Sequence, residues 1–196
     1  SFRLDGPLDM RLDPGGGRTA ADVVNAWPVG ELARIFRELG EERQAWRIAR
    51  AVERERQERP FRTTRQLADL VGRVAPRAGQ GIHPATRVFQ ALRMAVNDEL
   101  GSLRLALPAA WGVLKPGGRL AVISFHSGED RVVKHFGRAL ERDYEVVGEV
   151  DVPEWRRPRP PLLAWVNRKP VFAGLAEVAA NPRSRSARLR VMEKLR

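Results

Sequence analysis

The 196-residue sequence contains no cysteine, a single tyrosine and only three histidines. The absence of cysteine excludes disulfide bonds and thiolate metal sites, and it suits a reducing compartment such as the cytoplasm. No apolar run approaches the roughly 20 residues that a membrane-spanning helix needs, so no membrane partner is expected. The first residues, 1–5, do not resemble a signal peptide and include no initiator methionine. We therefore expect that an N-terminal part is missing.

Several catalytic and cofactor-binding patterns are also missing. No glycine-rich loop follows a predicted strand, because the one cluster of glycines, residues 15–17, lies in a predicted loop. His83, His126 and His135 do not have the spacing of metal ligands, so no metal site is expected. No Gly-x-Ser-x-Gly elbow occurs, and His126 with Ser127 lacks a placed acid for a hydrolase triad.

Positive charge is in excess and is concentrated near the C-terminus. The net charge is +11, and residues 155–196 contain eleven basic and two acidic residues. Such a stretch favours a polyanionic partner, above all a nucleic acid. An arginine-rich composition without any special partner explains the charge almost equally well.

The N-terminal part of the sequence predicts a loop followed by helices. Residues 1–18 are rich in glycine and proline, which is typical of a loop, and Asp9 with Arg11 is expected to form an ordinary ion pair there. Apolar residues then recur with the period of a helix in four stretches, which predicts a compact helical module. These stripes are Ala20, Val23, Val24 and Trp27; Leu32, Ile35, Phe36 and Leu39; Ala45, Ile48, Ala49 and Val52; and Leu67, Leu70, Val71 and Val74.

The ends and surfaces of these helices can also be predicted. Thr19 with Asp22, and Thr63 with Gln66, have the spacing of capping boxes, so helices should begin after these threonines. The third stripe, within residues 43–54, interleaves glutamate and arginine on its other faces. This pattern favours a solvated, ion-paired surface over an RNA contact.

A mobile basic loop is predicted at residues 77–81. Beyond it, Pro84 is expected to open one long helix that runs to Leu107 and spans about 36 Å at 1.5 Å per residue. Its apolar residues form a single seam. Arg93 and Asn97 lie where polar groups interrupt the seam, either as solvated side chains or as a buried hydrogen-bonding patch facing a site.

A tight turn and a buried strand follow this helix. The Pro-Gly-Gly sequence of residues 116–118 ends a helix and permits a sharp reversal. Residues 120–123 are apolar and partly β-branched, which predicts a parallel strand covered on both faces. His126 and Ser127 lie at the end of this strand, where open α/β sheets bind their ligands. Residues 129–140 then predict the helix that completes a β-α unit.

The last third of the sequence predicts short elements. Residues 153–161 contain four prolines and are expected to form an extended, poorly ordered surface segment. The other expected elements are a weak strand at 144–152, strands at 163–171 and 188–193, and a short helix at 173–180 that is ended by Asn181 and Pro182.

Longer matches point to one family. They are residues 5–11 (DGPLDMR), 40–42 (GEE), 47–50 (RIAR), 83–87 (HPATR), 89–93 (FQALR), 96–100 (VNDEL), 124–127 (SFHS), 129–134 (EDRVVK) and 181–187 (NPRSRSA). Together, in this order, they resemble the MraW family of bacterial small-subunit ribosomal RNA methyltransferases. Only residues 144–161 fall outside the resemblance, and Gly128 stands where the family usually has leucine.

The resemblance implies an α/β fold, namely the C-terminal part of a Rossmann-like class I methyltransferase domain with an inserted all-helical module. Residues 1–14 would be a loop of the methyltransferase domain, 15–82 the helical substrate-recognition module, and 83–196 the C-terminal part of the domain. The family's cofactor, S-adenosylmethionine, would be bound by residues upstream of Ser1. The chain then looks like the C-terminal two-thirds of the enzyme and is expected to be inactive alone.

The resemblance also implies an activity, which is methyl transfer to the exocyclic amine of a cytidine in the decoding region of small-subunit ribosomal RNA. That reaction needs an unstacked base, an oriented amine and a proton acceptor. His126, Ser127 and Asn97 are the supporting catalytic candidates. The candidates for substrate binding are Asp9, Arg11, Arg93, Arg183, Arg185 and Arg188, the arginines through RNA phosphates. The expected partner is small-subunit ribosomal RNA or the assembled subunit, and a homodimer is a further option.

Two other classes of function stay open. A non-catalytic RNA-binding protein would be made of the same parts, with catalysis lost together with the N-terminal segment. A helical DNA-binding regulator would use residues 19–75, but its best recognition helix, residues 64–75, has only Arg65 and Arg73 against Asp69. A glycine-rich loop encoded just upstream would favour the enzyme over both.

Overall fold

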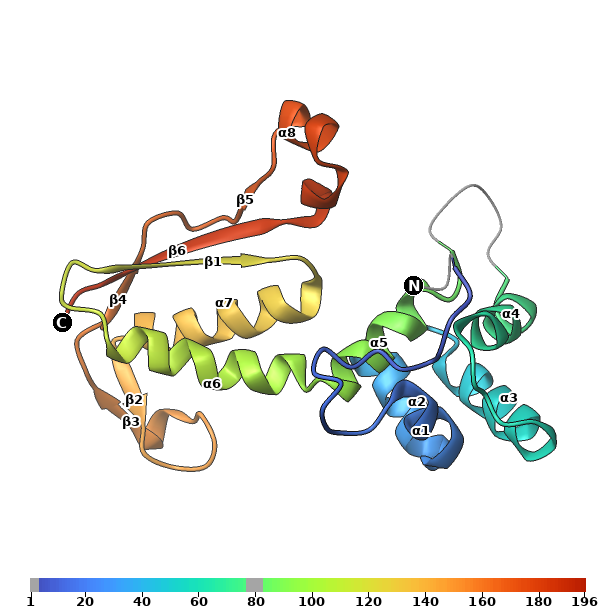
Figure 1. Ribbon diagram of the computed structural model, residues 1–196. Helices are drawn as coiled ribbons and strands as arrows, with labels where there is room; N and C mark the ends of the chain where they lie inside the picture. The colour runs from blue at the N-terminus through green and yellow to red at the C-terminus, as the bar shows by residue number, and fades with distance from the viewer. Residues whose placement is uncertain (1–3, 77–82) are drawn as a thin grey trace. The chain divides into compact units, whose positions relative to one another are not determined.

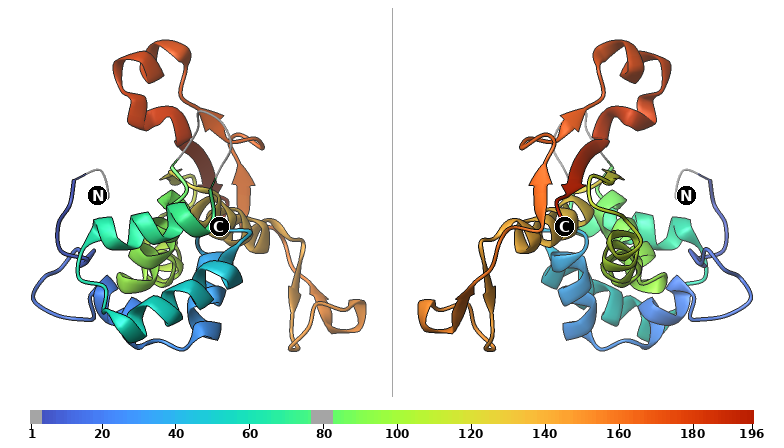
Figure 2. Two further views of the ribbon diagram at one scale, coloured as in Figure 1. Left: turned by 90° about the vertical axis from the view of Figure 1, so that its right-hand side faces the viewer. Right: turned by 90° about the vertical axis from the view of Figure 1, so that its left-hand side faces the viewer.

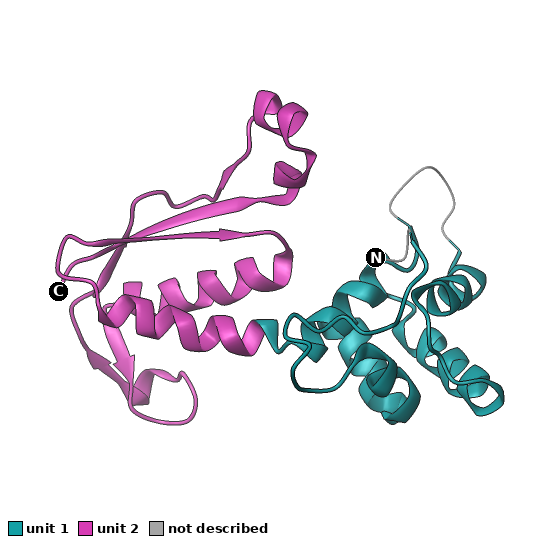
Figure 3. Cartoon of the chain, in the orientation of Figure 1, with its two compact units in different colours: residues 1–99 teal, residues 100–196 magenta. Residues whose placement is uncertain are grey.

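The computed structural model describes residues 4–76 and 83–196, and it divides into two compact units, residues 1–99 and 100–196 (Figure 3). The basic loop predicted at residues 77–81 lies outside the described residues. None of the described helices is long and apolar enough to cross a membrane.

The first unit is helical, as the sequence predicts. Its helices are α1 (Ala20–Ala26), α2 (Val29–Glu38), α3 (Ala45–Glu58), α4 (Thr64–Val74) and α5 (Thr86–Val96) (Figure 1). Both predicted capping boxes are confirmed, because the Thr19 hydroxyl accepts the N–H of Asp22 and the Thr63 hydroxyl accepts that of Gln66. Each cap satisfies backbone donors that the first turn of a helix leaves without partners.

The core of this unit is continuous across all of these helices. The predicted apolar stripes face inward, and Leu32, Phe36, Ile48 and Leu67 are fully buried. The N-terminal segment belongs to the same core, since Leu8 is buried and its N–H donates to the carbonyl of Arg62. α5 also packs here, although its residues were predicted to belong with residues 83–196.

The single long helix predicted from Pro84 to Leu107 is wrong. The structure has α5 and a separate helix α6 (Glu99–Gly112), with Asn97 and Asp98 between them. Asp98 adopts a left-handed conformation with φ of 44°, which an α-helix cannot continue. The apolar seam runs through both helices, so the spacing of apolar residues did not reveal the break.

The second unit combines helices with short strands. Its elements after α6 are β1 (Arg119–Ser124), α7 (Ser127–Glu141), β2 (Tyr144–Val146), η1 (Pro153–Trp155), β3 (Arg156–Pro158), β4 (Leu163–Trp165), β5 (Val171–Phe172), α8 (Leu175–Ala180), η2 (Pro182–Ser186) and β6 (Arg188–Lys194). The main sheet has the order β1-β6-β4, with β5 also paired to β6, and every pairing is antiparallel. β2 and β3 form a separate hairpin that extends away from this sheet (Figure 2).

The strand predicted at residues 120–123 is confirmed, but its predicted environment is wrong. β1 pairs with antiparallel β6 and with no other described strand. Leu120 and Val122 pack toward the core, whereas Ile123 is 58% exposed. Only one face of β1 is therefore covered by the described residues. The segment predicted to be extended and poorly ordered, residues 153–161, instead supplies η1 and β3 of the hairpin.

The core of the second unit is small. Its buried members are Leu107, Trp111, Val133, Leu163 and Met192, which come from α6, α7, β4 and β6. The Trp111 and Phe136 rings meet edge to face with centroids 6.2 Å apart. This core holds α6 and α7 together on one face of the sheet.

Candidate functional site

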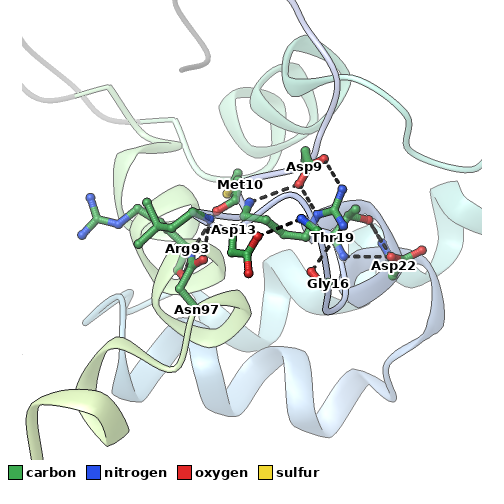
Figure 4. A network of polar contacts seen from close by, with 11 residues as sticks. Asp9, Met10, Asp13, Gly16, Thr19, Asp22, Arg93 and Asn97 are labelled. Carbon is green, nitrogen blue, oxygen red and sulfur yellow. Dashed lines mark hydrogen bonds and ion pairs between the residues drawn. The ribbon is translucent and has the colours of Figure 1, made fainter.

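A polar network in the first unit surrounds Asp9 (Figure 4), and Arg11 is its main partner. The Arg11 guanidinium donates to both carboxylate oxygens of Asp9, at 2.8 and 2.9 Å, and its remaining amino group donates to the carbonyl of Gly16. The Asp9 carboxylate also accepts the backbone N–H of Arg11. The two-oxygen pairing fixes the orientation of both side chains. The pair predicted from the sequence therefore closes the loop that precedes α1.

Asn97 attaches the same loop to the end of α5. Its amide nitrogen donates to the carbonyls of Met10 and Arg93, and its amide oxygen accepts the N–H of Leu12 at 2.8 Å. Met10 adopts a left-handed conformation with φ of 66°, which turns the loop toward Asn97. The sequence placed Asn97 among the catalytic candidates. In the structure, both ends of its side-chain amide are hydrogen-bonded to backbone groups.

These contacts decide what the network can do chemically. The hydrogen bonds from the Arg11 side chain and then from its backbone lower the pKa of Asp9 to about 2. Asp9 is therefore a weak base at neutral pH, and the neutral amide of Asn97 is not a base at all. The arrangement gives the loop a fixed shape and does not supply a proton acceptor from either residue.

Arg93 lies beside this network and is engaged by an acid. Its guanidinium donates to both carboxylate oxygens of Glu99, at 2.6 and 2.9 Å. Asp9, Arg11, Asn97 and Arg93 therefore lie on one loop and one helix end of the first unit.

In the second unit, His126 caps the helix that follows β1. Its Nδ1 accepts the N–H of Glu129, while the Glu129 carboxylate accepts the N–H of Phe125. Burial by itself raises the pKa of Glu129, but the hydrogen bonds from His126 and Phe125 outweigh burial and hold that pKa below its ordinary value. His126 Nε2 lies 3.3 Å from the Glu129 carboxylate. Ser127, the other predicted candidate here, is the first residue of α7.

A buried acid gathers two arginines of β6 near the same sheet end. The Asp130 carboxylate lies 2.7 Å from Arg190 Nε and 3.4 Å from Arg188 Nη1. The hydrogen bond from Arg190 is the main reason that the pKa of Asp130 is lowered. Arg188, predicted to bind substrate, is thus partly held by an acid. The sequence did not identify Asp130, because its partners are about sixty residues away along the chain.

Arg183 and Arg185 have a different setting from Arg188. Both lie on η2, just before β6, and both side chains are exposed. Among the residues that the structure describes, neither guanidinium has an ion-pair partner. The register of β6 against β1 places Arg188 opposite Ser124, two residues before His126. The structure therefore brings His126, Ser127 and Arg188 to one end of this sheet, and the η2 arginines lie just before Arg188 in the chain.

Comparison with known proteins identifies the family. The profile of the MraW methylase family matches residues 1–195. The chain belongs to this family. A protein of Bradyrhizobium diazoefficiens named ribosomal RNA small subunit methyltransferase H is 56% identical over 194 residues, which cover 99% of this chain and 58% of that protein. A protein of the same name from Syntrophotalea carbinolica is 54% identical, covering 100% of this chain and 62% of its own length. This MraW-family chain thus spans about three fifths of these curated relatives.

The described residues of this MraW-family chain do not fit a methyltransferase cofactor. Class I enzymes hold it with a glycine-rich turn between a strand and a helix. Residues 15–17 precede α1 and follow no strand, and residues 117–118 come before β1 instead of after it. No described strand leads into a turn with repeated glycines.

Proposed function

We propose that this chain supplies the substrate-recognition module and the C-terminal sheet of an enzyme that methylates small-subunit ribosomal RNA. In this proposal the acceptor is the exocyclic amine of a cytidine in the decoding region, and the donor is S-adenosylmethionine. The observation that carries it is the identity of more than half of the residues, over essentially the whole chain, to relatives named ribosomal RNA small subunit methyltransferase H. A Rossmann-like class I domain interrupted by the helical module is the architecture that we propose for the complete protein.

S-adenosylmethionine would supply an electrophilic methyl group. Because the described residues do not fit this cofactor, we assign its binding to the part of the relatives' length that this chain does not match. The open edge of β1 supports that assignment. Among the described strands, β1 stands at the end of the sheet and pairs only with β6, and an unpaired strand edge is a surface on which further strands pair.

The residues of this chain would act on the RNA. The Asp9–Arg11 pair and Asn97 hold the loop of residues 9–16 in one shape, which is what orienting an unstacked base requires. Arg183 and Arg185 are exposed and would bind phosphates. His126 would keep the first turn of α7 in place through its capping bond.

The proposal is tested with the chain fused to the unmatched N-terminal part of the Bradyrhizobium relative. The fusion is incubated with radiolabelled S-adenosylmethionine and either free small-subunit RNA or assembled subunits, and the RNA is then digested to nucleosides for mass spectrometry. We expect label on the exocyclic amine of a cytidine. Label on another nucleoside, or on the cytosine ring carbon, would disprove the proposed acceptor.

The chain alone is the matched control in this experiment. We expect it to bind the RNA but to transfer no label and to show no saturable heat with S-adenosylmethionine in calorimetry. If the fusion also fails to transfer label while both proteins bind the RNA, the non-catalytic RNA-binding function is supported instead. The helical DNA-binding alternative is weakened by the structure, since Arg73 of its recognition helix is paired with Glu55 at 2.7 Å.

A further inference from the structure

One face of α3 presents a stripe of exposed arginines. Arg47, Arg50 and Arg54 are spaced by three and four residues, so they lie on the same side of the helix. Arg43 is exposed in the turn just before the helix. The opposite side of α3, which includes Ile48 and Val52, is fully buried in the core of the unit. The arginine stripe, defined as residues 43, 47, 50 and 54, therefore faces solvent.

The stripe is not neutralised by neighbouring acids. In the described parts of the chain, none of its four guanidinium groups has a carboxylate partner, and Arg47 donates only to the side-chain oxygen of Gln44. Glu55 of the same helix is engaged by Arg73 instead. The ion-paired surface that the sequence favoured for this helix is therefore wrong for the stripe.

Other arginines of the same unit are held by carboxylates or by backbone carbonyls. Arg34 on α2 is paired with Glu31 and Glu38, and Arg56 of α3 donates to the carbonyls of Val24 and Trp27. Like charges without counterions repel one another, so an unpaired row of them is an unfavourable way to build a surface. A bound polyanion removes that repulsion.

Trp46 adds a second feature beside the stripe. It precedes Arg47 directly and is 50% exposed, although the large apolar residues of the surrounding stripes are buried. An exposed indole next to arginines is the combination that proteins use to stack unpaired bases while holding the phosphates of the same strand. An acidic protein partner could pair with the arginines, but its carboxylates would not stack on the indole ring of Trp46.

Arg54, at one end of the stripe, also lines an open cavity of about 480 Å³ between α3 and α4. The wall of this cavity carries Arg59 and Arg73 beside Glu55 and Glu58, so its charges are mixed. α3 and α4 lie side by side in the first unit (Figure 1).

We propose that the arginine stripe and Trp46 bind a single-stranded segment of the substrate RNA, with the arginines on its phosphates and the indole stacked on an unpaired base. This inference rests on the proposed function, because it takes the RNA substrate from there. It adds a second RNA surface to the arginines of η2.

The test compares two triple variants of the chain that lose the same charge. The first changes Arg47, Arg50 and Arg54 to glutamine. The control changes three other exposed arginines to glutamine, namely Arg34, Arg73 and Arg119, each of which has an acid partner. Binding of a fluorescently labelled RNA hairpin from the decoding region is measured by anisotropy over a series of salt concentrations. Circular dichroism melts confirm that both variants fold.

For the stripe variant, we expect weaker binding and a salt dependence that is less steep by about two units, since each lost phosphate contact on a single strand removes about 0.7. The control should keep most of the slope. Equal changes in the two variants would overturn the proposal, because they would show only an effect of net charge. An unchanged slope in the stripe variant would overturn it as well. Failure of the unmutated chain to bind RNA would instead disprove the proposed function.

Trp46 gives an independent readout. Stacking of a base on the indole should quench its fluorescence, and the quench should be missing in Trp46→Phe. Trp46→Ala should weaken binding by about tenfold or more, whereas Trp46→Phe should recover a good part of the affinity. Equal affinity of Trp46→Ala and the unmutated chain would remove the indole from the proposed surface. Displacement of the RNA by poly-glutamate at equal charge concentration would show a surface for acidic polymers in general and would overturn the assignment to RNA.

Discussion

The two units of the chain bury their apolar residues to very different extents. In the first, every helix contributes to one cluster, in which Leu32, Phe36 and Ile48 are fully buried. In the second, the buried cluster is limited to a few residues of α6, α7, β4 and β6. Apolar side chains such as Ile123 and Phe172 stay 58% exposed there.

The difference shows that the two units are stabilised by different interactions. The helical unit relies on burial of apolar surface, which is the main favourable term in folding. The second unit has less of this burial and contains the ion pair of Asp130 and Arg190 inside its packed part. A buried ion pair is costly to break, because the remaining partner keeps an uncompensated charge. We therefore expect the first unit to be destabilised mainly by changes in its apolar packing and the second unit mainly by loss of its buried ion pair.

The largest effect is expected from Asp130→Asn. The variant leaves Arg190, whose side chain is only 8% exposed, without its carboxylate. We expect the second unit to lose about 3–5 kcal/mol of stability, while the first unit is unchanged. Hydrogen exchange followed by mass spectrometry measures this, with peptides of β6 reporting on one unit and peptides of α3 on the other.

Glu193→Gln is the control for this comparison. Glu193 also pairs with an arginine of the same sheet, Arg119, but the Arg119 side chain is 62% exposed. Exposed pairs contribute about 0–1 kcal/mol, so exchange in β6 should change little. If the β6 peptides of the two variants were equally protected from hydrogen exchange, the buried pair would not be what stabilises the second unit.

A smaller effect is expected from adding a methyl group at two glycines that lie close to neighbouring atoms, Gly40 and Gly137. A methyl group at Gly40 would collide with the carbonyl oxygens of Arg87 and Phe36, which are backbone atoms. At Gly137 in α7, it would meet the Trp165 ring, a side chain whose displacement would cost its hydrogen bond to Glu141 but would not require the backbone to move. Gly40→Ala should therefore destabilise the first unit by about 1–3 kcal/mol, and Gly137→Ala should cost the second unit less.

Gly72→Ala serves as the reference for both glycines. Gly72 lies inside α4 with no atom near the position of an added methyl group, so alanine there should stabilise the helix by up to about 1 kcal/mol. Denaturant titrations of the three variants rank their free energies of unfolding. A larger loss at Gly137 than at Gly40 would contradict the view that the helical unit is the more tightly packed one.

Local chemistry predicted much of the fold from the sequence. Capping boxes at Thr19 and Thr63 and the helical stripes depend on neighbours within a few residues, and these features are confirmed. The break at Asn97 could not be predicted in this way, because its partners, Met10 and Leu12, are more than eighty residues away. The covering of β1 was mispredicted for a similar reason, since an apolar strand does not reveal which of its faces finds a partner.

The candidate site was predictable as a set of residues and not as a set of roles. The sequence indicated Asp9, Arg11 and Asn97, and the structure brings them together. Their hydrogen bonds fix the conformation of the loop of residues 9–16. Residue type alone does not distinguish this structural role from a role in proton transfer. Trp46 was not predicted as a functional residue, because its 50% exposure depends on which face of α3 packs against the rest of the unit.

The smallest predicted effect concerns the pH dependence of the Asp9 pair, in the unit that relies least on charges. Arg11 and the backbone lower the pKa of Asp9 from 3.8 to about 2, so the folded chain favours the ionised carboxylate. The stabilisation is thus fully present above pH 3.8 and is lost as the pH falls through about 2.

Carbon-13 NMR of the Asp9 carboxyl group measures this directly, and we expect a midpoint near pH 2 that moves toward 3.8 in Arg11→Gln. Because Asp9 is exposed to solvent and salt screens such pairs, the first unit should stay folded through the titration and in Asp9→Asn. Unfolding of the helical unit at the Asp9 midpoint would mean that this unit depends on an ion pair as much as the second one does, and the contrast between them would fail.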